Sequence, residues 1–150
     1  MPRSGTDAVS TEQNPPAVSS RLARWFGRYL RRYFARHFDA IRLSGEEGLA
    51  TIGDAPLVIY TNHPSWWDPL LAHFLNRTLF PKRQFFAPID AEALKNYQVF
   101  RKLGFYGVQL DTQSGASSFL RTSQAILTAG NTSIWLTPEG QFVDARDHTR

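Results

Sequence analysis

The sequence predicts an α/β fold, with a mixed, mostly parallel sheet flanked by helices and preceded by an amphipathic N-terminal helix. Two observations support this prediction. Between residues 56 and 136, short apolar runs alternate with segments of helical periodicity. Strands separated by helices of this length form parallel βαβ units, whose helices cover the faces of the sheet. A chain of 150 residues, 42% of them hydrophobic, is sufficient for one such domain.

The N-terminal part of the chain divides into a polar segment and a helix. Residues 1–20 are rich in Ser, Pro and Thr and lack the apolar stretch of a secretory signal, so we predict a disordered tail. Residues 21–38 are predicted to form a helix. Its apolar side carries Leu22, Phe26, Tyr29, Leu30, Tyr33 and Phe34. Its basic side carries Arg21, Arg24, Arg28, Arg31, Arg32 and Arg36.

The two faces of this helix have three interpretations. Arginines beside acidic headgroups and aromatic rings at the acyl boundary are typical of a helix that lies on an anionic membrane surface. The same pattern fits a helix that packs its aromatic face on its own domain. Interleaved aromatic and arginine residues also suit single-stranded nucleic acid, although we expect no nucleic-acid partner.

The remaining elements are read from periodicity and turn residues. The predicted strands are 56–61, 84–88, 106–110 and 132–136. The predicted helices are 69–75, 91–103 and 117–129. Gly130 is expected to close the last helix, and residues 41–45 are expected to add an antiparallel edge strand.

Composition excludes several classes of protein. The sequence has no cysteine, which excludes disulfides and cysteine-based zinc or iron–sulfur sites. Its net charge of +4 favours anionic partners such as acidic lipid headgroups. Its mean hydropathy of −0.34 and the lack of a long apolar run argue against a membrane-spanning helix. We therefore expect a cytoplasmic protein that associates peripherally with a membrane.

The candidate catalytic residues lie in the stretch TNHPSWWDPLL, between the first predicted strand and the next helix. His63 and Asp68 are five residues apart, a spacing that would separate them on a continuous helix. Pro64 disfavours helix at His63 and leaves a turn in which the imidazole can approach the carboxylate. A histidine at the carboxyl end of a parallel strand lies where α/β sheets bind ligands. An adjacent carboxylate would fix its tautomer and raise its basicity, as deprotonation of a hydroxyl requires.

Each residue of this pair also has a purely structural interpretation. Asp68 followed by Pro69 is a good N-cap and N1 pair, so the aspartate could serve only to start the helix. His63 could be a hydrogen-bonded turn residue. Trp66 and Trp67 are expected to be packing or interfacial residues rather than substrate contacts.

A second informative stretch, WLTPEGQF at 135–142, again places a proline, an acid and a glycine at the end of a strand. Together the two stretches resemble the glycerolipid acyltransferase family of the lysophosphatidate acyltransferase type. That family has a first block of Asn-His, four residues and Asp, and a third block of Pro-Glu-Gly. The matching residues here are Asn62, His63, Asp68, Pro138, Glu139 and Gly140. The resemblance covers residues 40–142 approximately.

The resemblance implies that His63 is the general base for the acceptor hydroxyl and that Asp68 orients it. The hydroxyl, carried by a lipid, then attacks the thioester of acyl-CoA or acyl-carrier protein, which are the expected partners. The expected substrate-binding residues are Asn62, Ser65, Pro138, Glu139 and Gly140. No metal or other cofactor is expected, because the thioester is already activated.

Two arginines of the family pattern are absent. The second block usually ends in an arginine after a strand, but Asp111 and Thr112 stand there. The third block usually carries an arginine after the glycine, but Gln141 and Phe142 follow it here. Because those arginines are taken to hold the acceptor's phosphate, we expect an acceptor without an exposed phosphate monoester. The other possibility is that Arg121 or Arg146 supplies the charge.

Family members also continue beyond the third block with a further apolar, proline-containing segment. We therefore expect residues 39–150 to form an acyltransferase domain that is incomplete.

Three other functions stay open on the sequence alone. A catalytically inactive lipid-binding module of the same fold would fit the absent arginines. A serine hydrolase is disfavoured, since the nearest candidate for a G-x-S-x-G turn, SGAS at 114–117, lacks its second glycine. A metallohydrolase could use His63, Asp68 and His73, although no HExxH-like spacing supports it.

Overall fold

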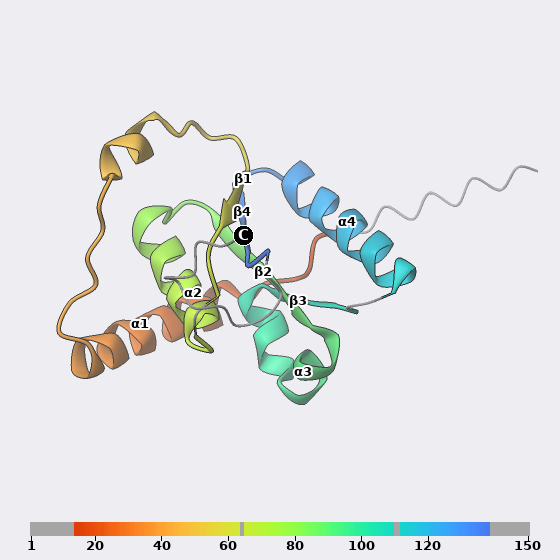
Figure 1. Cartoon of the computed structure of the whole chain (residues 1–150), viewed down its shortest axis with the longest axis horizontal. Helices are drawn as coiled ribbons and strands as arrows, with labels where there is room; N and C mark the ends of the chain where they lie inside the picture. The colour runs from red at the N-terminus through yellow and green to blue at the C-terminus, as the bar shows by residue number, and fades with distance from the viewer. Residues whose placement is uncertain (1–13, 64, 110–111, 139–150) are drawn as a thin grey trace, which may run out of the picture.

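The computed structural model describes residues 14–63, 65–109 and 112–138. The helices are α1 (Ser20–His37), α2 (Asp68–Leu79), α3 (Ala91–Asn96) and α4 (Gln113–Thr128), with short 3-10 helices η1 (Glu46–Thr51) and η2 (Gln98–Leu103). The strands are β1 (Leu57–Tyr60), β2 (Gln84–Asp90), β3 (Phe105–Val108) and β4 (Thr132–Leu136). These strands form one sheet in the order β1-β4-β2-β3, and each neighbouring pair is parallel (Figure 1). The predicted α/β fold class is confirmed.

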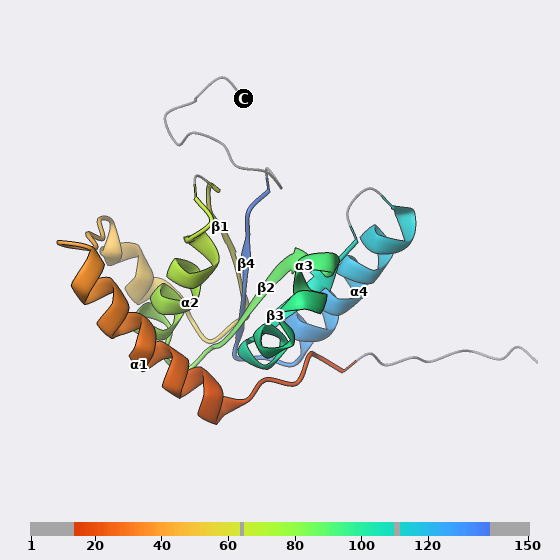
Figure 2. The same cartoon turned by 90° about the horizontal axis from the view of Figure 1, so that it is seen from below.

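Helices cover both faces of the sheet. One apolar cluster joins α1, α2 and α3 to one face through Ala23, Ala72, Leu94, Phe85 and Trp135. A second cluster joins α4 to the other face through Ile126, Phe86, Tyr106 and Ile134. The alternation of Phe85 and Phe86 between the clusters follows from the two-residue period of a strand. In Figure 2, α1 and α2 lie to the left of the sheet and α4 lies to its right.

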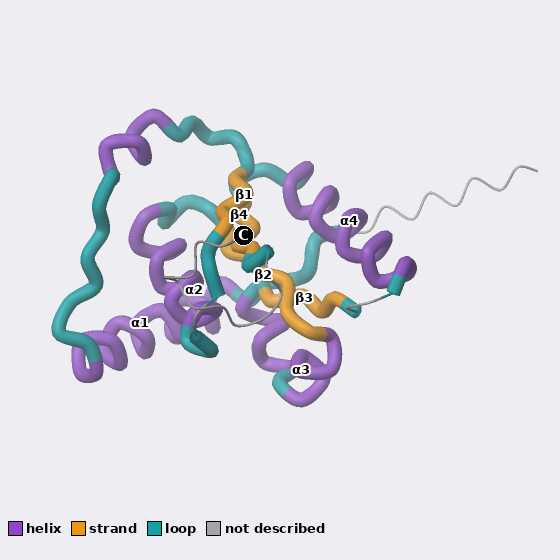
Figure 3. Tube along the Cα trace, viewed as in Figure 1, coloured by secondary structure: helices purple, strands orange, loops and turns teal. Residues whose placement is uncertain are grey.

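The expected edge strand at 41–45 is not formed. This segment lies in the connection between α1 and η1, and it is drawn as loop in Figure 3. Ile41 and Leu43 are both more than 40% exposed, so this short run buries too little apolar surface to stabilise pairing with the sheet. The described strands are consequently all parallel, with no antiparallel member.

Three predicted helices differ in extent from the observed ones. Helix α2 continues to Leu79, four residues beyond the predicted end at 75. The predicted helix at 91–103 breaks at Tyr97 (φ −128°, ψ 66°), which separates α3 from η2. Gly104 ends η2 with a φ of +104°, and a Cβ there would lie 2.1 Å from the carbonyl oxygen of Phe85. Helix α4 begins four residues earlier than predicted because Thr112 caps it, accepting the Gly115 N–H at 2.9 Å. Gly130, with a φ of +72°, follows the end of α4 as predicted.

A buried amide fixes α2 to the sheet. Asn76, which is 1% exposed, accepts hydrogen bonds from the Ser133 hydroxyl and, at 3.0 Å, from the Trp135 indole N–H. Its own NH₂ donates to the carbonyl of Arg83 at 3.1 Å. The Arg83 guanidinium in turn donates to the carbonyls of Gly53 and Ala55, just before β1. These contacts tie α2 to β4 and to the connections that precede β1 and β2.

Helix α1 packs on the domain. Its buried residues are Ala23, Leu30 and Phe34, and the Phe34 ring contacts Phe74 of α2 edge to face at 5.2 Å. The segment before α1 is also in contact, because the Ser19 N–H donates to the Lys102 carbonyl at 2.9 Å. None of the described helices is both long and apolar enough to cross a membrane.

Candidate active site

The site lies at the carboxyl edge of the sheet, where β1 and β4 end side by side. Tyr60 is in register with Leu136, and the Thr61 N–H donates to the Leu136 carbonyl at 2.8 Å. The chain that leaves β1 therefore passes close to the chain that leaves β4. In Figure 2 both strands end at the top of the view. This edge is where parallel α/β sheets place their ligands.

His63 and Asp68 are in direct contact. The Nδ1 atom of His63 lies 3.0 Å from Oδ2 of Asp68, and both side chains are largely buried, at 19% and 16% exposure. An ionised carboxylate only accepts hydrogen bonds, so Nδ1 carries the proton and Nε2 is the basic nitrogen of the ring. The turn predicted from Pro64 thus brings the pair together.

The carboxylate of Asp68 is aimed at the turn rather than at the helix. Trp67 occupies the N-cap position of α2, and Asp68 is the first residue of the helix. Oδ2 of Asp68 accepts the Ser65 N–H at 2.9 Å in addition to contacting His63. The interpretation of Asp68 as the N-cap is therefore wrong, because its side chain contacts His63 and Ser65 in the preceding turn instead.

Ser65 organises the same turn. Its backbone N–H donates to Asp68, its hydroxyl oxygen accepts the Trp67 N–H at 3.3 Å, and its carbonyl accepts the Asp68 N–H at 3.1 Å. These three bonds use both backbone groups of Ser65 and its hydroxyl oxygen as an acceptor within the loop. Its expected contact with substrate stays a prediction.

The other predicted substrate-binding residues lie near this edge where they are described. Asn62 is exposed next to His63, and Pro138 is exposed two residues beyond the end of β4. Glu139 and Gly140 fall outside the described residues, as do Asp111, Gln141, Phe142 and Arg146. Two strand ends therefore contribute predicted residues to one edge of the sheet.

His73 does not belong to this site. It is 1% exposed and lies edge-on between the rings of Phe26 and Phe85, with centroid distances of 5.2 and 4.9 Å. Burial, and then the charge of Arg77, lower the pKa of His73 to about 4, so the ring is neutral at pH 7. The described residues contain no group of three potential metal ligands, and the alternative that joined His73 to His63 and Asp68 is wrong.

The serine-hydrolase alternative also lacks its geometry. Residues 114–117 lie inside the first turns of α4, and not at a sharp turn between a strand and a helix.

Sequence reasoning missed a row of aromatic rings, Trp25, Tyr29, Tyr33 and Trp67, that connects α1 to the turn between His63 and Asp68. Trp25 stacks on Tyr29 at 6.0 Å, and Tyr29 lies 6.1 Å from Tyr33. Tyr33 contacts Trp67 at 5.1 Å, directly before Asp68. The spacing of 25, 29 and 33 at i, i+4 and i+8 was the available signal for such a row.

Comparison with known proteins identifies one family. A family model described as Acyltransferase matches residues 40–150. No match was found among curated proteins or among solved structures.

Proposed function

The chain belongs to the acyltransferase family, and we propose that this transferase moves a fatty acyl group from acyl-CoA or acyl-carrier protein to a lipid hydroxyl. The observation that carries the proposal is the 3.0 Å contact between His63 and Asp68 at the carboxyl edge of the sheet. The family assignment supports acyl transfer in general, and the His63–Asp68 contact supports general-base activation of the acceptor hydroxyl.

In the proposed mechanism, Nε2 of His63 takes the proton of the acceptor hydroxyl as its oxygen attacks the thioester carbonyl carbon. Asp68 stabilises the imidazolium that forms and holds Nδ1–H in the correct orientation. The C–S bond then breaks, and the imidazolium returns the proton to the departing thiolate. Each step uses groups present in the turn, and the activated thioester supplies the driving force.

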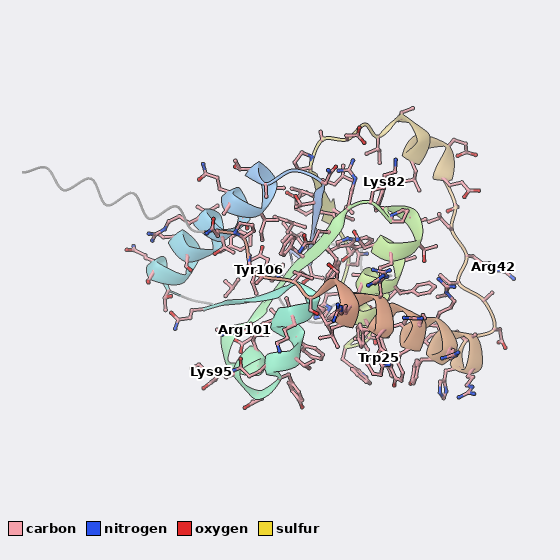
Figure 4. The ribbon with its side chains drawn as sticks, turned by 180° about the vertical axis from the view of Figure 1, so that it is seen from behind. Trp25, Arg42, Lys82, Lys95, Arg101 and Tyr106 are labelled. Carbon is pink, nitrogen blue, oxygen red and sulfur yellow. The ribbon has the colours of Figure 1, made fainter. Side chains whose placement is uncertain are left out.

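The proposed acceptor is a lipid at an anionic membrane surface. Trp25, Tyr29 and Trp66 are 59%, 49% and 61% exposed. Trp25 and Tyr29 belong to the aromatic row, and the Trp66 ring lies 3.9 Å from that of Trp67 at the end of the row. Trp25 is labelled on α1 in Figure 4. Tryptophan and tyrosine favour the boundary between headgroups and acyl chains, and arginines of α1 lie beside them. A membrane in contact with this row would bring the acceptor close to His63.

The packing interpretation of α1 accounts for its other apolar residues. Leu30 and Phe34 are buried against the domain, and Leu22 and Phe26 are half-buried there. Tyr29 shares the predicted apolar side but lies at its edge, half exposed. We propose that α1 packs on the domain with one side and contacts lipid with the adjacent aromatic flank.

We also propose an acceptor without an exposed phosphate monoester. The sequence lacks both arginines that the family pattern would provide, and the hydroxyl of Thr112 is engaged in capping α4. A neutral, glycosylated or phosphodiester-headgroup lipid would not need two guanidinium contacts. Preferential acylation of lysophosphatidate, lost on Arg121→Ala or Arg146→Ala, would replace this proposal with a relocated phosphate site.

The experiment that tests the function is release of free thiol from acyl-CoA and from acyl-carrier protein in the presence of a panel of hydroxyl lipids. Mass spectrometry should show a product heavier than one acceptor by one acyl group. Thiol release that depends on no acceptor would indicate hydrolysis. No release with any donor and acceptor would instead favour a catalytically inactive lipid-binding module.

A further inference from the structure

A cluster of three arginines lies where α1 crosses α2. Burial, and then the charges of Arg24 and Arg31 of α1, lower the pKa of Arg77 of α2, so the guanidinium of Arg77 lies close enough to both of these arginines to be repelled by them. Within the described part of the chain, the one ion pair is His63–Asp68, and it involves none of the three. Like charges gathered without an acid repel one another, and an anion bound between them replaces that repulsion with charge-assisted hydrogen bonds.

Gly27 explains how the cluster is built. It follows Arg24 by three residues and precedes Arg31 by four, so all three positions share one stripe of α1. A Cβ at Gly27 would lie 2.6 Å from Nε and 2.8 Å from Cδ of Arg77. The side chain of Arg77 therefore crosses α1 over the glycine, and its guanidinium enters the interval between the two arginines of α1.

An apolar hollow continues the same stripe. It has a volume of about 250 Å³ and is lined by Arg31, Phe34, Ala35 and Phe38 from α1 and its end, with Ile41 and Phe74. Ala35 follows Arg31 by one turn, so the basic part of the stripe leads directly into the hollow. Asp39 is the one acid in the lining. The volume is below that of a complete small-molecule site and fits part of an acyl chain.

We propose that this surface binds one anionic glycerophospholipid, with its phosphate on Arg24, Arg31 and Arg77 and part of an acyl chain in the adjacent hollow. Arg31 belongs to both parts, which is the arrangement that an amphiphile with a phosphate next to a hydrocarbon chain requires. Planar guanidinium groups bind phosphate oxygens through paired, charge-assisted hydrogen bonds.

The bound lipid is a docking lipid and not the acceptor. Arg77 follows Asp68 by nine residues, which separates their backbones by about 13 Å along α2 at 1.5 Å per residue. The proposed phosphate site and the His63–Asp68 pair therefore lie near opposite ends of α2, and we assign the lipid bound there to docking rather than to the reaction. The site adds to the proposed membrane contact of α1 and does not depend on acyl-transfer chemistry.

The test uses soluble dihexanoyl phosphatidate, added to the whole chain without an acyl donor and followed by titration calorimetry at low salt. Inorganic phosphate and dihexanoylglycerol are the two partial probes. The lipid should bind at least about tenfold more tightly than either. Equal affinity for inorganic phosphate would overturn the lipid assignment, because the hollow would then contribute nothing.

Three variants distinguish binding at this site from nonspecific attraction of the lipid to positive charge. Arg77→Gln should weaken binding of the phosphatidate about tenfold, whereas Arg36→Gln, which removes the same charge from another flank of α1, should change it less than twofold. Gly27→Ala keeps every charge and favours helix, but its Cβ displaces Arg77, so it should also weaken binding about fivefold. Equal effects of the two Gln variants, or unchanged binding by Gly27→Ala, would overturn the proposal. Circular dichroism of each variant checks that a loss of binding is not a loss of fold.

Discussion

At the scale of single residues, the turn proposed to be catalytic contains one carboxylate with two partners. Asp68 contacts His63 and also accepts the N–H of Ser65, so the same side chain shapes the turn and orients the imidazole. The two contributions can be separated because asparagine retains an acceptor oxygen but carries no charge.

We predict that Asp68→Asn lowers kcat by about 10²- to 10⁴-fold with little change in melting temperature, because an amide cannot stabilise the imidazolium. Initial rates and thermal unfolding of the same preparation measure both quantities. Asp54→Asn, which removes an exposed charge before β1, is the matched control. If rate and melting temperature fell together, Asp68 would have a structural role alone.

His73 is predicted to make stability dependent on pH. Its pKa is about 4 in the folded protein and 6.5 in the unfolded chain. Between these two pH values the ring is protonated in the unfolded chain and neutral in the folded protein. The free energy of unfolding should therefore fall as the pH decreases from 6.5 to 4, by up to about 3 kcal/mol from this group.

His73→Leu tests this prediction, since it removes the titrating group from an apolar environment. Denaturant unfolding of both proteins between pH 7.5 and about 4 gives the comparison. As the pH falls from 6.5 to 4, the free energy of unfolding should decrease more for the wild type than for the variant. A constant difference would mean that His73 is readily protonated in the fold.

At the scale of elements, the hydrogen bonds of Asn76 hold α2 against the sheet, and thereby hold Asp68 at the start of that helix. We predict that Asn76→Ala lowers the free energy of unfolding by about 2–4 kcal/mol, because the buried donors of Ser133 and Trp135 lose their acceptor. Thr78→Ala, which removes an exposed bond to the Phe74 carbonyl of the same helix, should cost under about 0.5 kcal/mol. Similar losses would show that the buried amide is unimportant.

Elements with strong local signals were predictable from sequence. The apolar runs at 84–88 and 132–136 correspond to β2 and β4, and Gly130 marks the end of α4. The break at Tyr97 and the loop at 41–45 were not predictable, because periodicity records which residues are apolar and not whether a partner covers them. The start of α4 was missed because the cap at Thr112 carries less signal than the apolar residues that follow.

The contact between His63 and Asp68 was predictable, because a proline after His63 disfavours helix there and favours a turn that can bring the two side chains together. The roles of Ser65 and Asn76 were not, since their partners are set by how α2 packs on the sheet. His73 looked like a potential ligand in sequence, yet its position between two rings is a consequence of tertiary packing.

At the scale of the whole molecule, the aromatic row and the arginines of α1 should act together on membranes. We predict that the chain binds vesicles containing anionic lipid and that its affinity falls as salt rises, because charges are screened over about 8 Å at physiological ionic strength. Co-sedimentation with vesicles at several salt concentrations measures this dependence.

The contribution of the exposed aromatic residues to vesicle binding can be tested separately. Trp25→Ser and Trp66→Ser should each weaken vesicle binding several-fold, whereas Leu120→Ser on α4, at 65% exposure, should not. Equal weakening by all three would indicate nonspecific hydrophobic adsorption. Absence of binding at every salt concentration would leave α1 as a packing helix.

The most direct test of the central claim is the rate of acyl transfer by His63→Ala compared with that of His37→Ala, which removes the same ring from the exposed end of α1. With the best donor and acceptor from the lipid panel, His63→Ala should lose at least about 10³-fold in kcat/KM while its circular dichroism and melting temperature stay close to wild type. His37→Ala should retain most activity. Unchanged turnover by a folded His63→Ala protein would contradict the assignment of His63 as the general base.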